Sequence, residues 1–252
     1  MTEPVKMGDR DKKLPTNRSS STDVGDFLAK LAATPNVKPA GTRGRLVFAM
    51  DATASRQPMW DHAAQIQGEM FSETAALGGL DIQLCFYRGF GEFKVSPWLS
   101  QSSDLLRMMT SVFCRAGETQ IRKVLGHAIN ETKARRIGAL VFVGDCVEED
   151  VDRLGALAGE LGVLGVPVFM FHEGRDPVAA FAFKQIASLS GGAYCRFDEG
   201  SARTLRELLS AVAVFAAGGR PALEDLADRR GGDIKRIAHQ LAHQSARQSE
   251  GH

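Results

Sequence analysis

The stretch from Phe48 to Gln57, FAMDATASRQ, decides the fold. The apolar run 46–50 ends here in Asp51, and Thr53 and Ser55 follow it. A continuous apolar run bounded by turn residues is typical of a strand buried on both faces. Because side chains two apart on extended backbone point the same way, these three oxygen-bearing side chains can converge on one point. Taken alone, the pattern is more commonly a turn residue followed by a helix N-cap.

A second apolar run, IGALVFVGD at 137–145, also ends in an aspartate. Two strands that are apolar throughout are expected to be neighbours at the sheet centre, and ligands of open α/β sheets bind beyond the carboxyl ends of the strands. Thr119, just before a helical stretch, is expected at the same edge, although an N-cap explains it equally well. These residues supply only oxygen ligands, which suits Mg²⁺ or Mn²⁺ and argues against zinc. The candidate ligands are Asp51, Thr53, Ser55, Thr119 and Asp145.

Strands and helices alternate along the rest of the chain. The short link between the expected strands 80–89 and 92–99 permits only antiparallel pairing, and Pro97 suits a sheet edge. Further strands are expected at 166–174 and 193–198, and helices at 57–77, 102–113, 119–133, 148–162, 181–192 and 201–217. The sequence therefore predicts an α/β fold: a Rossmann-like, doubly wound, mostly parallel six-stranded sheet with one antiparallel edge strand and helices on both faces.

The two ends of the chain differ from its middle in composition. Residues 1–22 are polar and are expected to be disordered. We expect a short helix and linker at 23–43, the folded domain at 44–217, and a polar tail with possible short helices at 218–252.

The overall composition is that of an ordinary globular protein, with 252 residues, 44% of them hydrophobic. No apolar run approaches the roughly 20 residues that span a bilayer, and no signal peptide is recognisable, so we expect a cytoplasmic protein. The net charge of +1 gives no reason to expect nucleic acid or a membrane as partner. The four cysteines lie far apart and are expected to be free thiols.

The candidate ligands occur in an order that resembles von Willebrand factor A (VWA) domains. The metal-ion-dependent adhesion site (MIDAS) of that family follows Asp-x-Ser-x-Ser, then a distant Thr and a distant Asp. Here the pattern appears as DATAS at 51–55, Thr119 and Asp145. The resemblance covers roughly residues 44–217. The chain is more similar to a group of bacterial VWA-domain proteins than to secreted adhesion domains.

The resemblance implies a role for each candidate ligand. It implies that the hydroxyls of Thr53, Ser55 and Thr119 contact the metal directly, whereas Asp51 and Asp145 act through water. It also implies that a partner protein completes the coordination with a carboxylate. The chain departs from the family pattern at three positions: Thr53 replaces the usual Ser, and Ala54 and Cys146 stand where glycine is common.

Three functions compete on this basis. The leading one is a binding module whose metal ion bridges to an Asp or Glu of a partner protein. The second is a Mg²⁺-dependent hydrolase or phosphatase with Asp51 as nucleophile. An aspartate at a strand end followed by Thr53 resembles haloacid-dehalogenase-like enzymes, which usually carry a second Asp at the position of Thr53 and a well-placed lysine. Because neither is evident here, we expect no enzyme. The third is a scaffold with a vestigial site that binds through its tails or its edge hairpin.

Several other residues are candidates for binding or structural roles. Tyr87, Arg88, Phe90 and Trp98 are candidates for a partner-binding surface on or beside the edge hairpin, although packing explains the aromatics equally well. The acidic run Glu148, Glu149 and Asp150 is expected to complement a helix dipole rather than to form a second metal shell. Structural roles are expected for the side chains of Cys146 and His172.

Overall fold

The computed structural model describes residues 21–34, 43–54, 79–197 and 202–230. The predicted helix at 57–77 and the candidate ligand Ser55 lie outside these residues.

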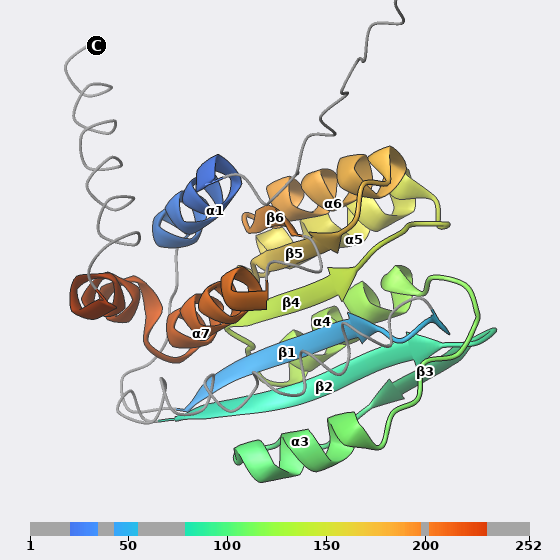
Figure 1. Ribbon diagram of the computed structural model, residues 1–252, viewed down its shortest axis with the longest axis horizontal. Helices are drawn as coiled ribbons and strands as arrows, with labels where there is room; N and C mark the ends of the chain where they lie inside the picture. The colour runs from blue at the N-terminus through green and yellow to red at the C-terminus, as the bar shows by residue number, and fades with distance from the viewer. Residues whose placement is uncertain (1–20, 35–42, 55–78, 198–201, 231–252) are drawn as a thin grey trace, which may run out of the picture.

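The described residues form a six-stranded sheet of order β3-β2-β1-β4-β5-β6 (Figure 1). Neighbouring strands are parallel except β2 and β3, which form the antiparallel hairpin. The predicted fold class is therefore confirmed. The strands are β1 (Gly44–Asp51), β2 (Leu80–Arg88), β3 (Glu92–Val95), β4 (Ala139–Gly144), β5 (Val168–Glu173) and β6 (Ala193–Phe197).

The two continuous apolar runs became the two central strands. Every residue of β1 and of β4 is buried, and the two strands pair in parallel with Met50 opposite Val143. From β1 the sheet grows toward β2 on one side and toward β4 on the other. The strand order therefore reverses between β1 and β4, which is where open α/β sheets bind ligands.

The edge strand β3 is shorter than the predicted strand at 92–99. It ends at Val95, and Pro97, which has no amide hydrogen to donate, follows. Pairing resumes only as an isolated bridge between Leu99 and Ile82. The half-exposed pattern of β3 agrees with its place at the edge of the sheet.

Helices cover both faces of the sheet (Figure 1). One buried cluster joins alternate residues of β1, such as Phe48, to α1, α3 and α7. The other joins the intervening residues, such as Val47, to α4, α5 and α6. The helices are α1 (Ser21–Ala33), α3 (Ser102–Thr110), α4 (Ile121–Ala134), α5 (Val151–Val163), α6 (Pro177–Leu189) and α7 (Ala202–Arg230).

One helix begins where the sequence predicts, and another begins earlier. Helix α3 begins at Ser102 as predicted, with Gln101 as its N-cap, and Gln101 makes no side-chain cap bond. Helix α6 begins at Pro177 instead of residue 181, because the Asp176 carboxylate accepts hydrogen bonds from two amides of its first turn.

Both flanks of the expected domain pack into its core. The Phe27 ring of α1 lies 5.7 Å from the Phe169 ring and 5.1 Å from the Phe171 ring, centroid to centroid. Helix α7 continues past residue 217 to Arg230, across a kink at Gly219 (φ 71°, ψ −164°). Ala222, Leu223 and Leu226 beyond the kink are buried in the same cluster as Phe27. None of the described helices combines the length and apolar character that a membrane span requires.

Replacing Phe27 with alanine tests whether α1 is an integral part of the domain. The fully buried ring contacts β5, so its loss is expected to lower the free energy of unfolding by about 3–5 kcal/mol. Urea denaturation followed by circular dichroism measures this change. Lys30→Ala, an exposed position on the same helix, is the control. Equal stability of the two variants would contradict the packing of α1 on the sheet.

Candidate metal site at the carboxyl edge of the sheet

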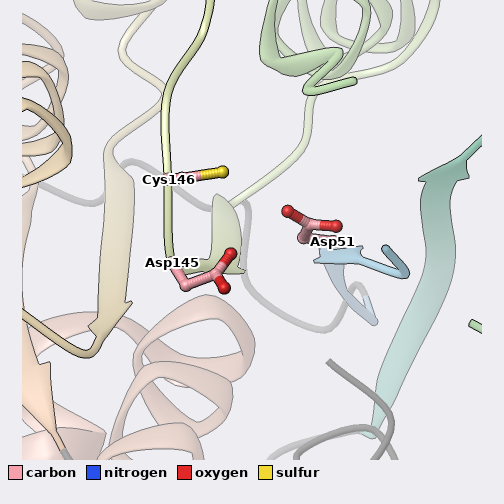
Figure 2. Close-up of side chains that lie close together, drawn as sticks. All are labelled: Asp51, Asp145 and Cys146. Carbon is pink, nitrogen blue, oxygen red and sulfur yellow. The ribbon is translucent and has the colours of Figure 1, made fainter. Parts of the chain in front are cut away.

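The parallel pairing of β1 and β4 brings two aspartates together. Asp51 is the last residue of β1, and Asp145 directly follows β4. One ligand atom from each of Asp51, Asp145 and Cys146 lies within 4.8 Å of the other two. Figure 2 shows the two carboxylates facing one another and the Cys146 side chain pointing into the same space. The sequence-based expectation that the two aspartates meet at one edge is therefore confirmed.

Burial makes this cluster electrostatically costly without a cation. The side chain of Asp51 is fully buried, and those of Asp145 and Cys146 are partly buried. One Asp51 oxygen accepts a hydrogen bond of 2.7 Å from the amide of Thr53, which is itself buried. Two adjacent carboxylates in a poorly solvated place repel each other, and a bound cation offsets that repulsion.

The pKa values of neighbouring groups reflect the negative charge at this edge. The pKa of Cys146 is raised to about 12, first by burial and then by the charges of Asp145 and Asp51. The pKa of Tyr87 is raised well above its usual value, again by burial first and then by Asp51. A cation would act against the electrostatic part of both shifts.

Thr119 is held at the same edge by Glu148. The Thr119 amide donates to the Glu148 carboxylate at 2.8 Å, and the Glu148 amide donates to the Thr119 hydroxyl at 3.0 Å. The alternative role of Thr119 as a helix cap is wrong, because Gln120 is the N-cap of α4 and makes no side-chain cap bond. This reciprocal pair ties the loop before α4 to the segment that carries Asp145.

Glu149 supplies the missing cap of α4 from a distant part of the chain. Its carboxylate accepts hydrogen bonds from the amides of Ile121 and of Arg122, the latter at 2.9 Å. Within the acidic run 148–150, only Asp150 caps the following helix, accepting from the amides of Asp152 at 3.0 Å and Arg153 at 3.2 Å. The expectation of a helix-dipole role thus holds for Asp150, while Glu148 and Glu149 organise the Thr119 loop.

The other side of the Thr119 loop is hydrogen-bonded to the ends of β1 and β2. The Arg115 amide donates to the Ala52 carbonyl at 2.9 Å, and the Glu118 amide donates to the Gly89 carbonyl at 3.3 Å. Gly117 packs directly on Gly89, and a Cβ atom at Gly117 would lie 2.2 Å from the Gly89 oxygen. The loop therefore requires glycine at 117 to stay in place.

The predicted partner-binding residues have different surroundings. Tyr87 is fully buried and stacks on Phe142, so its assignment to an exposed surface is wrong and the packing alternative is correct. Arg88 donates to the Phe113 carbonyl at 2.7 Å and pairs with Glu92 at 2.9 Å. A role for Arg88 in partner binding stays a prediction.

Trp98 lies in a network within the chain. The Arg45 guanidinium carbon lies over the Trp98 ring, 3.8 Å from the ring centroid. The indole nitrogen of Trp98 donates to Glu131 at 3.1 Å. The side chain is partly exposed, so a role for Trp98 in partner binding also stays a prediction.

Two exposed aromatic residues lie beside the Thr119 loop: Phe90, which is a predicted partner-binding candidate, and Phe113, which is not. Phe90 is 84% exposed at the turn between β2 and β3, and Phe113 is 73% exposed after the end of α3. The glycines on either side of Phe90, Gly89 and Gly91, were the sequence signal that Phe90 belongs to a turn. Both have positive φ in the structure. Phe113 was assigned to a helix that in fact ends at Thr110.

His172 has the structural role expected of it. The buried ring accepts or donates a hydrogen bond of 2.9 Å with the Tyr194 hydroxyl and packs edge-on against Phe183. Burial lowers its pKa, which keeps the ring neutral.

Comparison with known proteins identifies the fold. No protein-family model matches the sequence, and no curated protein matches it. Among solved structures, the SpRpn10 VWA domain superposes with a TM-score of 0.52 at 14% identity, over 67% of this chain and 94% of that one. The vWF domain of the type V pili tip protein Mfa5 from Porphyromonas gingivalis gives a TM-score of 0.53 at 10% identity, over 68% and 95%. The chain has a VWA fold.

Another VWA-like match contains a metal. Proximal thread matrix protein 1 from the mussel byssus, with a zinc-occupied MIDAS motif, matches with a TM-score of 0.52 at 13% identity, over 71% of this chain and 48% of that one. Identities this low establish the fold alone. Within that fold, Asp51 and Asp145 lie at the carboxyl ends of β1 and β4, and Thr53 and Thr119 lie in segments that are hydrogen-bonded to them or to their flanks; their role as MIDAS residues stays a prediction.

Gly117→Ala tests whether the Thr119 loop belongs to a metal site. The added methyl group has to displace the loop from Gly89, so affinity for divalent ions is expected to fall by at least about 10-fold. Isothermal titration with Mg²⁺, Mn²⁺ and Zn²⁺ measures it. The control is Gly126→Ala in α4, where a Cβ atom meets nothing within 4 Å. Equal affinity of both variants for divalent ions would show that the loop does not contribute to metal binding.

Proposed function

We propose that this VWA domain binds a partner protein through a divalent cation held at the carboxyl edge of the sheet. An Asp or Glu of the partner completes the coordination. The observation that carries the proposal is the convergence of Asp51, Asp145 and Cys146 within 4.8 Å, beside a Thr119 loop held by Glu148.

The balance of charge explains why the cation would attract an acidic partner. Asp51 and Asp145 offset the charge of a divalent ion, and a further anionic ligand from the partner adds a charge-assisted contact that water cannot fully replace. Oxygen ligands alone favour Mg²⁺ or Mn²⁺, the ions proposed from the sequence. The thiol of Cys146 adds a ligand of another kind. The neighbour with a zinc-occupied MIDAS supports metal binding at this place in the fold.

The surface beside the site supports a protein partner. Phe90 and Phe113 are exposed, and Arg88 at the end of β2 donates to the Phe113 carbonyl. Aromatic residues and arginine dominate the energetics of protein interfaces. We expect the partner to cover these side chains as its carboxylate reaches the metal.

The proposed role is binding without turnover, so hydrolysis by Asp51 is not expected. The near-zero net charge gives no reason to expect nucleic acid or a membrane surface as the partner. The cytoplasmic location and the bacterial source stay predictions.

A pull-down from native lysate tests the proposed function. The wild-type domain is compared in Mg²⁺, in Zn²⁺ and in EDTA, together with Asp51→Ala in each metal. A partner retained only by the wild type with metal is the expected result, because the Asp51 carboxylate is at the centre of the cluster.

Asp104→Ala is the matched control for this experiment. Asp104 is a surface acid on α3 that pairs only with Arg107 among the ion pairs of the described residues. Circular dichroism confirms that both variants fold. Recovery of the same proteins in all samples would show that the metal site does not determine binding.

A further inference from the structure

Cys146 reaches the metal cluster because the chain turns at the end of β4. In a continuing strand, Asp145 and Cys146 would point to opposite faces of the sheet. Strand β4 ends at Gly144, and both side chains point into the space beside Asp51 (Figure 2). The local backbone therefore adds a sulfur atom to the two carboxylates.

The separations within the cluster suit one shared ion. In tetrahedral coordination by zinc, with bonds of about 2.0–2.3 Å, two ligand atoms lie roughly 3.3–3.8 Å apart. The atoms of Asp51, Asp145 and Cys146 already lie within 4.8 Å of one another. The three side chains are therefore candidates to share one ion.

Two other roles for Cys146 fit the structure less well. A reactive thiol is activated by a neighbouring base or positive charge, whereas the side chains grouped with Cys146 are two carboxylates. A cysteine that only fills the core is buried, as Cys85 and Cys195 are, whereas Cys146 is partly exposed at the sheet edge. A thiol that faces two carboxylates at an open edge is arranged as a metal ligand.

We propose that Cys146 binds the ion directly and that the site therefore selects Zn²⁺, or another thiophilic divalent ion, over Mg²⁺. Thiolate is a soft ligand that zinc accepts and magnesium does not favour. The thiol proton passes to solvent as the metal–sulfur bond forms. This inference rests on the proposed metal site and names its ion, in place of the Mg²⁺ expected from oxygen ligands alone.

A mixed set of ligands also suits the proposed function. Asp51, Asp145 and Cys146 provide three protein ligands, and a zinc ion with three protein ligands keeps a further position for an incoming group. The carboxylate of the partner would take that position. Selectivity for zinc and binding of an acidic partner then depend on the same three side chains.

Titration of the full, reduced chain with Co²⁺ tests the role of Cys146 directly. Co²⁺ replaces zinc in such sites, and a thiolate ligand adds an intense near-ultraviolet charge-transfer band. We expect the band in the wild type and its absence in Cys146→Ser. Cys114→Ser is the matched control, since Cys114 is also a partly exposed cysteine outside any disulfide but is not a member of the cluster.

Affinities for Zn²⁺ and Mg²⁺, measured by titration calorimetry, complete the test. Cys146→Ser is expected to weaken Zn²⁺ binding by at least about 10-fold and to change Mg²⁺ binding much less. Metal binding without the band, with equal Zn²⁺ affinity in Cys146→Ser, would overturn the role of Cys146 and leave the proposed function standing. Absence of any metal binding to the wild type would overturn both.

Discussion

Mutual repulsion between two carboxylates is the constraint on which this edge of the molecule depends. The parallel pairing of β1 and β4 leaves Asp51 and Asp145 facing one another where burial limits the screening by water. The surrounding structure holds this arrangement in place rather than relieving it. Glu148 accepts a hydrogen bond from the Thr119 amide, and Glu149 caps α4. The carboxylates of these two further acids therefore bind backbone amides. A cation bound between the two carboxylates would lower their mutual repulsion.

The fold could be predicted because its central strands are simple in sequence. Apolar runs closed by aspartate placed β1 and β4 at the centre, and a short link required the hairpin of β2 and β3. The end of α7 could not be placed in this way. Gly219 and Pro221 are typical of a helix end, yet the chain kinks there and continues, because Leu223 and Leu226 still bury their side chains in the core. Tertiary packing decided that boundary.

The site was predictable only where strand ends determine it. Asp51 and Asp145 follow from the parallel sheet, and Thr119 from its loop, whereas the contacts of Glu148 and Glu149 join residues 27 to 29 positions apart. No local pattern reports such contacts. Cys146 was expected to have a structural role because no histidine pairs with it in the sequence, and only the turn after Gly144 brings its side chain beside the two aspartates. Including the Cys146 thiol among the ligands changes the proposed ion from Mg²⁺ or Mn²⁺ to Zn²⁺.

Anomalous X-ray diffraction from crystals grown separately with Mn²⁺ and with Zn²⁺ would test the central claim most directly, because it locates the ion itself. The account predicts an anomalous peak between Asp51 and Asp145, beside the Thr119 loop, with the zinc peak adjacent to the sulfur of Cys146. A chain that crystallises with these ions but shows no peak at this edge would contradict the account, since the carboxylates would then be held together without a cation.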